Sequence, residues 1–370
     1  MDTTDPVYIV LRVVAFLAGA YLVVYTVLSG IRTFVLPRPA QVLLFRLVFL
    51  NVRRLFNLRA VRAESYAERD RVMALYAPIA LFFMPVVLMG LVMLGFMAIY
   101  WALSPLSFIE SFKLSGSALF TLGSFTNDDP LLMVFEFSEA LLGMILVALL
   151  IAYLPTIYNA FTRRETQVQL LEVRAGTPPS SWELIARSHR NGELTELREF
   201  WSDWQVWFAE LEESHTSLPA LAFFRSPRPE LSWVTAAGVV LDAASLLLST
   251  VEIPREPRAA FCIRSGYLAL RQIAIFFEAP YNDVPTPTDP ITITREEYND
   301  VCAYLETQGV PLCPDRDQTW RDYAGWRVNY DRELVSLAAL TMAPYAPWSS
   351  DRSLSPTAYH DQNGEAGRWE

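Results

Sequence analysis

The chain has 370 residues, of which 52% are hydrophobic and only 19% are charged. This composition excludes a chain that is disordered throughout, because disordered chains are poor in apolar residues. The formal net charge of −10 argues against a nucleic-acid-binding protein, which needs basic patches to neutralise phosphates. Residues 1–155 carry 11 basic and 10 acidic residues, whereas residues 156–370 carry 19 and 30. The chain therefore has two parts of different chemistry.

The first part contains three segments that are apolar enough to cross a membrane. Runs of 19, 38 and 23 residues lack any charged side chain, and a bilayer core needs about 20 apolar residues in a helix. We therefore expect an all-α, multi-pass membrane protein, whose spans are 8–31, 74–103 and 131–157.

The distribution of arginine predicts the orientation of these spans. Residues 32–71 contain nine arginines and three acidic residues, and loops rich in arginine stay in the cytoplasm. The N-terminus and residues 104–130 should then lie outside the plasma membrane, and everything after the third span inside. The acidic start of the chain does not fit a cleaved signal peptide.

Residues 41–58 predict an amphipathic helix at the cytoplasmic leaflet. Arg46, Arg53 and Arg54 fall on one helical face, and no uncharged stretch there is long enough to span. This helix is either a cuff around the membrane part or a simple connection; with the first span it makes up the expected N-terminal region 1–71.

The segment between the second and third spans is the most informative. Its first part, from Pro105, is compatible with a helix but too short and too polar to cross a bilayer. A T-x-G turn and a pair of acidic residues come next, before the third span. The turn consists of Thr121, Leu122, Gly123, Ser124 and Phe125.

This order of span, short helix, T-x-G turn and span resembles the pore module of the potassium-channel-like cation channels of the bacterial type. The resemblance covers residues 72–160 and identifies 105–126 as a re-entrant pore helix and selectivity filter. It implies that Thr121, Leu122, Gly123, Ser124 and Phe125 line the path of monovalent cations, K⁺ and/or Na⁺. It also implies a homotetramer in a lipid bilayer, with one pore loop from each chain.

The filter sequence departs from the Thr-Val-Gly-Tyr-Gly of that family. Presenting successive backbone carbonyls to one axis requires residues that tolerate positive φ, hence glycine. Gly123 meets this need at the third position, but Ser124 and Phe125 replace the tyrosine and the second glycine. We therefore expect weak selectivity among cations. The alternative is that the turn is an ordinary exterior loop.

Several acidic residues fit the outer mouth of a pore, where they would concentrate cations. These are Asp128, Asp129 and Glu136, which could equally be solvated loop residues. Glu139 lies inside the third span, where a lone acid costs about 2.5–3.5 kcal/mol on insertion scales. It should therefore face a partner or a wet cavity.

Two residues of the third span could shape an inner gate. Gly143 resembles the glycine at which related inner helices bend, although helix packing through a small residue explains it equally well. Pro155 would kink the helix where it leaves the membrane, or else end it.

The second part predicts an all-α cytoplasmic domain over 161–342 and a disordered tail over 343–370. Apolar residues from Leu194 to Leu211 recur at helical spacing, as a core stripe or, less readily, a coiled-coil seam. Residues 231–251 could be mistaken for a fourth span, but Asp242 interrupts them. Further helices are expected at 258–279, 294–308 and 320–342.

We expect no enzyme, cofactor or metal site. Paired G-x-G motifs, G-x-S-x-G motifs and clusters of histidine are all missing, and the three cysteines form no C-x-x-C pair. Arg187, His189 and Arg190 could hold an anion, such as an unidentified cytoplasmic ligand, or form a solvated face. Two function classes remain: a cation channel, or a non-conducting membrane sensor or scaffold with the same architecture.

Overall fold

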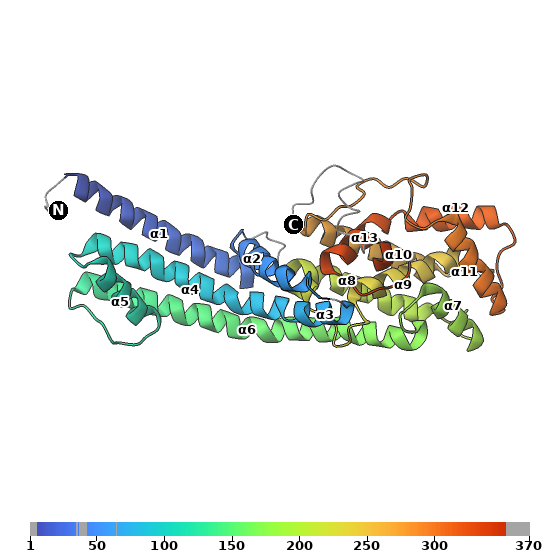
Figure 1. Cartoon of the computed structure of the whole chain (residues 1–370), viewed down its shortest axis with the longest axis horizontal. Coiled ribbons are helices and arrows are strands. Elements are labelled where there is room, and N and C mark those ends of the chain that lie inside the picture. The colour runs from blue at the N-terminus through green and yellow to red at the C-terminus, as the bar shows by residue number, and fades with distance from the viewer. Residues whose placement is uncertain (1–5, 35, 37–42, 64, 353–370) are drawn as a thin grey trace. The chain divides into compact units, whose positions relative to one another are not determined.

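The computed structural model describes residues 6–34, 36, 43–63 and 65–352, which are coloured in Figure 1. Apart from one isolated β-bridge between Val251 and Leu312, the regular structure in this part of the chain is helical. The expectation of an all-α protein is therefore confirmed. The chain divides into two compact units. The first unit comprises Met1–Leu58 and Leu75–Tyr158, and the second comprises Arg59–Ala74 and Asn159–Glu370.

The expected boundaries differ from these units. The first span and the amphipathic helix are packed with the expected pore module in one unit, instead of forming a region of their own. The short helix α3 (Tyr66–Ala74), which precedes the second span, belongs to the second unit.

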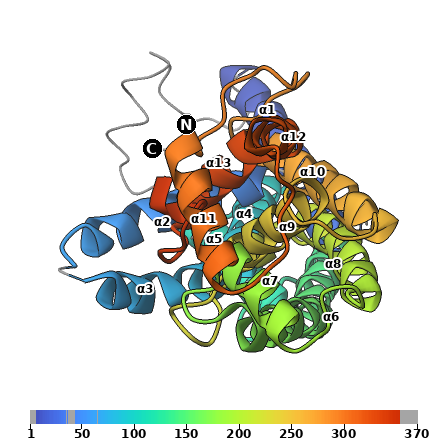
Figure 2. The ribbon, with the colours of Figure 1, turned by 90° about the vertical axis from the view of Figure 1, so that its right-hand side faces the viewer.

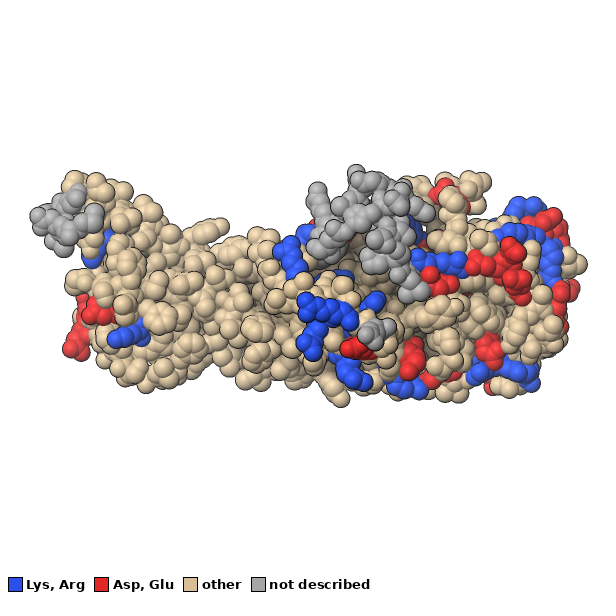
Figure 3. All heavy atoms as spheres, viewed as in Figure 1, with Lys and Arg blue, Asp and Glu red and all other residues tan. Residues whose placement is uncertain are grey.

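The first unit is built from long apolar helices. Within the described residues, the helical stretches Pro6–Phe34, Tyr66–Leu103 and Pro130–Ala175 are long and apolar enough to cross a membrane, as expected. The face of this unit seen in Figure 3 carries few charged side chains. The helices are α1 (Pro6–Phe34), α2 (Leu43–Ala60), α4 (Tyr76–Leu103), α5 (Phe108–Leu119) and the first part of α6 (Pro130–Ala175).

Helices α1 and α4 cross at a pair of glycines. A Cβ atom added to Gly19 would lie 2.5 Å from the carbonyl oxygen of Gly95, and one added to Gly95 would lie 2.6 Å from Cγ2 of Val23. Small residues at such a crossing let two backbones approach closely, which gives membrane helices their van der Waals contact.

Gly95→Ala should therefore destabilise the first unit, whereas Gly90→Ala in the same helix should be neutral or slightly stabilising. A Cβ on Gly90 would meet nothing within 4 Å, and alanine favours a helix over glycine by about 0.5–1 kcal/mol. Thermal unfolding in detergent distinguishes the two variants. Equal midpoints would show that the close crossing does not contribute to stability.

Helix α6 continues through Pro155 to Ala175. The possibility that Pro155 ends the helix is therefore wrong. The same helix belongs to the first unit up to Tyr158 and to the second unit from Asn159.

The second unit is a bundle around one buried helix, as Figure 2 shows from its end. The central helix α9 (Trp233–Ser249) is buried along nearly its whole length. It is packed against α7 (Ser181–Arg190), α10 (Pro257–Phe276), α12 (Arg316–Arg327) and α13 (Asp331–Thr341). Helices α8 (Arg198–Ser217) and α11 (Arg295–Thr307) complete the bundle.

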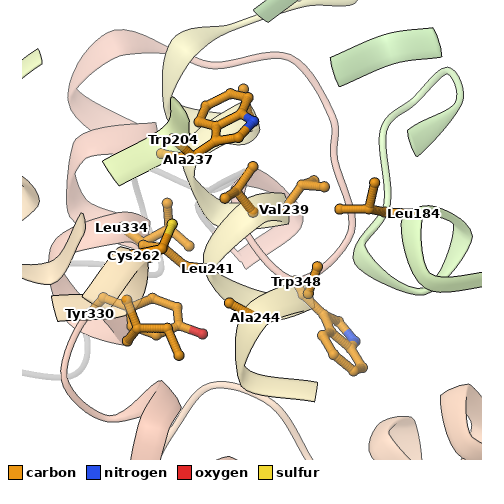
Figure 4. Packing of buried hydrophobic residues seen from close by; sticks show 14 of the residues in the cluster. Leu184, Trp204, Ala237, Val239, Leu241, Ala244, Cys262, Tyr330, Leu334 and Trp348 are labelled. Atoms are coloured by element: carbon orange, nitrogen blue, oxygen red, sulfur yellow. The ribbon is translucent and has the colours of Figure 1, made fainter. Parts of the chain in front are cut away.

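Figure 4 shows the core at α9, where Ala237, Val239, Leu241 and Ala244 lie among side chains of the surrounding helices. Since α9 lies in the core of this bundle and has only 17 residues, the fourth-span alternative for 231–251 is not supported. Its residues are apolar because other helices surround it.

The stripe from Leu194 to Leu211 is a core stripe, because its members are all buried in the second unit: Leu194, Leu197, Trp201, Trp204, Phe208 and Leu211. Helix α8 begins only at Arg198, so Leu194 lies in the turn before it. The expected helix over 320–342 is two helices, α12 and α13, which are separated at Val328–Tyr330.

An ion-paired network crosses the middle of this core. The guanidinium of Arg327, which is fully buried, donates through Nη1 to both carboxylate oxygens of Asp242 on α9, at 2.7 and 2.8 Å. Its Nε donates to Asp331, and its Nη2 to the carbonyl of Trp348. Tyr330 also donates to Asp242. Asp242, which interrupts an apolar stretch in the sequence, is thus a paired core residue.

The prediction of disorder from Ala343 is wrong for residues 343–352. Ala343, Ala346 and Trp348 are buried, and a 3-10 helix follows at Ser350–Arg352. The indole of Trp348 packs edge-on against that of Trp182, and its carbonyl accepts from Arg327. The rest of the predicted tail, 353–370, lies outside the described residues.

Candidate functional site

The expected pore helix is α5, a helix of only 12 residues between α4 and α6. Ser107 begins it with a capping box: its hydroxyl accepts from the amide of Glu110, and the Glu110 carboxylate accepts from the Ser107 amide at 2.8 Å. The indole of Trp101 at the end of α4 stacks on the ring of Phe108. These contacts fix where α5 starts, close to the end of α4.

Thr121 ends α5 in a Schellman motif. The amide of Thr121 donates to the carbonyl of Ala118, and the amide of Leu122 donates to that of Ser117 at 2.8 Å, which is the bond pattern of this helix end. Thr121 occupies the left-handed position with φ of 53°. A β-branched residue is strained there, and strain of this kind concentrates at functional sites.

Ser117 holds both ends of the turn that follows. Its carbonyl accepts from the amide of Leu122, and its hydroxyl accepts from the amide of Phe125 at 3.0 Å. The ring of Phe125 is packed against the apolar core of the first unit. The loop 121–125 is therefore tied back to the helix from which it leaves, by a residue that the sequence pattern did not single out.

The middle of this loop is open. Gly123 has φ of 62°, so the loop uses the conformational freedom for which glycine was expected at this position. Leu122, Gly123 and Ser124 are exposed within the chain, and the Leu122 side chain is 66% exposed. The hydroxyl of Thr121 donates to the carbonyl of Phe120. Phe125 does not adopt positive φ, in keeping with its bulky side chain.

The three proposed mouth acids have different environments. Asp128 is exposed. Asp129 is exposed too, but it is also the N-cap of α6, since its carboxylate accepts from the amide of Leu131 at 2.8 Å. Glu136 is half-buried on α6, and its Oε1 is shielded from solvent. Only the two aspartates are thus placed on an open surface of the chain.

Glu139 is fully buried in the first unit and has hydrogen-bond partners on two other helices. Its Oε2 accepts from the hydroxyl of Tyr100 on α4 at 2.8 Å, and its Oε1 lies 2.5 Å from the hydroxyl oxygen of Ser115 on α5. The expectation that this acid needs a partner agrees with these contacts. Neither Tyr100 nor Ser115 could be predicted as a partner, because nothing in the sequence pattern connects them to Glu139.

Gly143 lies one turn further along α6, against the end of α5. A Cβ atom there would lie 2.5 Å from the carbonyl oxygen of Leu119. This close contact supports helix packing as the role of Gly143; whether the helix also bends there during gating stays a prediction.

Beyond Pro155, α6 is anchored in the second unit by Arg164. Its buried guanidinium donates to the carbonyls of Leu221 and Phe224, both at 2.8 Å, and pairs with Glu165. It also lies 3.3 Å from Nε2 of His215, whose Nδ1 donates to the carbonyl of Leu211. Burial, together with the charge of Arg164, holds the pKa of His215 well below its usual range, so that the neutral imidazole can accept this bond.

The basic cluster of the second unit, Arg187, His189 and Arg190, lies next to a carboxylate of the same unit. Arg187 and Arg190 both pair with Glu183, at 2.6 and 3.1 Å. The hydroxyl of Tyr304 donates to the same carboxylate. These bonds lower the pKa of Glu183 despite its burial. The one carboxylate offsets one of the two arginine charges, so a net charge of +1 remains at this cluster.

No other chemical site stands out in the described part of the chain. It contains no group of three or more His, Cys, Asp or Glu side chains placed to hold a metal ion. Cys262 and Cys302 are buried, and burial raises the pKa of both thiols. The loop 121–125 and the contacts behind it are the best candidate for a functional site.

Comparisons with known proteins add nothing to this site: no family model matches the chain, and neither a curated protein nor a solved structure matches it.

Proposed function

We propose that the chain is the subunit of a homotetrameric cation channel with weak selectivity. The observation that carries this proposal is the exposed loop 121–125, which has left-handed backbone at both Thr121 and Gly123 and follows a short helix between two helices long enough to span a membrane. A loop of this kind can turn successive carbonyl oxygens toward a common axis, where they replace the water around a cation.

The exposure of the loop supports assembly of several copies. Helix α5 is too short to cross a bilayer, and irregular backbone at membrane depth is tolerated only where protein buries it or where it lines a water-filled path. Within one chain, Leu122, Gly123 and Ser124 are exposed and are not covered by protein. Other copies of the chain would cover the loop, and a single pore loop per chain closes around an axis by fourfold rotation.

The proposed selectivity follows from the two ends of the loop. Ser117 and the Schellman turn fix the inner end, so that the carbonyls of Thr121 and Leu122 can form defined rings. At the outer end Phe125 is packed into the core of its own subunit, in place of a second glycine. K⁺ and Na⁺ would both pass, and Asp128 and Asp129 would attract them to the mouth.

The second unit would serve assembly and gating in the cytoplasm, the side predicted by the arginine-rich segment 32–71. The continuity of α6 favours this role. Helix α6 runs without interruption from the first unit into the second, where Arg164 fixes it. The chain before α4 is fixed as well, because Asp70 on α3 pairs with Arg225 at 3.2 Å. Movement of the second unit would therefore act on both α4 and α6.

A non-conducting sensor or scaffold is the second candidate. The packing of Phe125 and the Schellman turn at Thr121 favour it, because both are compatible with an ordinary loop that closes a helix. The anchored α6 would transmit signals equally well in such a protein.

The number of subunits tests the assembly on which the channel depends. Native mass spectrometry of the purified full chain in detergent should give a tetramer. A strictly monomeric, dimeric or trimeric particle would remove the basis of the pore, and the scaffold candidate would then be preferred.

A further inference from the structure

The contacts around Glu139 need one more hydrogen atom than would be present if its carboxylate were ionised. The hydroxyl oxygen of Ser115 lies 2.5 Å from Oε1 of Glu139 and 3.1 Å from the carbonyl oxygen of Met93 on α4. A serine hydroxyl has one hydrogen, and it can donate to only one of these acceptors. If Glu139 were ionised, one of the two contacts would hold two acceptors and no hydrogen.

A neutral acid satisfies every contact. In that form Oε1–H of Glu139 would donate to Ser115, and the hydroxyl of Ser115 would then be free to donate to Met93. The hydroxyl of Tyr100 donates to Oε2 of Glu139. Glu139 is fully buried, and it forms no ion pair with the described residues. An ionised form would therefore lack a positively charged partner for its buried charge.

We infer that Glu139 is held as the neutral carboxylic acid and that its proton clamps α5 between α4 and α6. The role of this clamp behind a pore rests on the proposed function, whereas the protonation of Glu139 does not. The clamp lies directly behind the candidate pore segment. Ser115 is two residues before Ser117, which binds the amides of Leu122 and Phe125. Glu139 is therefore a positioning residue for the loop.

Alkaline pH should weaken this clamp. When hydroxide removes the proton from Oε1, the hydroxyl of Ser115 can bind either Glu139 or Met93 but no longer both, and a buried charge replaces the neutral acid. Stability therefore falls as pH rises. The titratable groups that face Glu139 are Tyr100 from α4 and Glu136 from α6. Helix α5 faces it with the uncharged Ser115.

The test compares Glu139→Gln and Glu139→Ala with the control Glu196→Gln, which replaces an exposed acid of the second unit, all in the full chain. The amide of glutamine can donate to Ser115 and accept from Tyr100 at every pH. Glu139→Gln should therefore keep the wild-type unfolding midpoint at neutral pH and lose part of the alkaline decrease. Glu139→Ala should have a lower midpoint, and Glu196→Gln should keep the wild-type pH profile.

Infrared spectroscopy gives a readout that needs neither conduction nor a stable variant. The wild-type protein should show the carbonyl stretch of a buried, protonated acid at neutral pH, and Glu139→Gln should lack this band. A missing band in the wild type, or a Gln variant as unstable as the Ala variant, would overturn the inference. Failure of the channel proposal alone would leave the band and the stability profile in place.

Discussion

Replacing Arg327 with Met should lower the free energy of unfolding of the second unit by about 3–5 kcal/mol, because it leaves a buried carboxylate without its cation. Arg327 is fully buried, and it is the residue that pairs with Asp242 on the central helix α9. It also donates to Asp331 and to the carbonyl of Trp348. Its removal therefore affects α9, α13 and the chain after α13 together.

Arg321→Met on the same helix is the matched control. Arg321 is exposed and donates to the side chain of Gln318, so its replacement should change stability by no more than about 0.5 kcal/mol. The double variant Asp242→Asn with Arg327→Met should recover part of the loss, because no buried charge on α9 then lacks a partner. Tryptophan fluorescence during thermal unfolding reports on this unit. If Arg327→Met unfolded like Arg321→Met, the network would be irrelevant to stability.

Gly123→Val should abolish cation flux. Gly123 has φ of 62°, and a β-branched residue in that region costs about 1–3 kcal/mol, which applies once in each of four subunits. The loop would avoid this cost by leaving the conformation in which its carbonyls face a common axis. The measurement is cation uptake by vesicles that contain equal amounts of wild-type or variant protein.

Gly116→Val is the control for this exchange. Gly116 lies within the helix α5 at ordinary φ, and a Cβ atom there would meet nothing within 4 Å in its own chain. This variant should assemble and conduct. Normal flux through Gly123→Val would mean that ions do not follow the segment 121–125.

Local signals in the sequence predict the helices well. The uncharged stretch 140–162 predicts the first part of α6 but not its continuation to Ala175. The Asp129 cap of α6 and the Ser107-x-x-Glu110 capping box of α5 were not predicted. Gly123 was expected to have positive φ from the needs of a filter that presents successive carbonyls to one axis, and it does.

The partners of buried polar residues could not be predicted in this way. Glu139 requires a partner, but Tyr100 and Ser115 lie 39 and 24 residues away, and only the packing of three helices brings them together. Asp242 is 85 residues from Arg327 for the same reason. The apolar stretch around Asp242 has the composition of a membrane span. It differs from a span because other helices surround it, and this packing cannot be read from the local sequence.

The prediction for residues 343–352 was wrong for a related reason. Proline, serine and glycine after Ala343 suggested disorder, yet the indole and the carbonyl of Trp348 both have partners in the second unit. One large aromatic residue with a defined binding place outweighs the composition of the residues around it.

The most direct test of the proposed function is the reversal potential of the purified wild-type chain in a planar bilayer under opposed K⁺ and Na⁺ gradients. A tetrameric pore with only its inner carbonyl rings secured should carry cation currents that reverse close to zero, because it barely distinguishes the two ions. A tetramer that carries no cation current under any of these gradients would contradict the channel and leave the non-conducting scaffold.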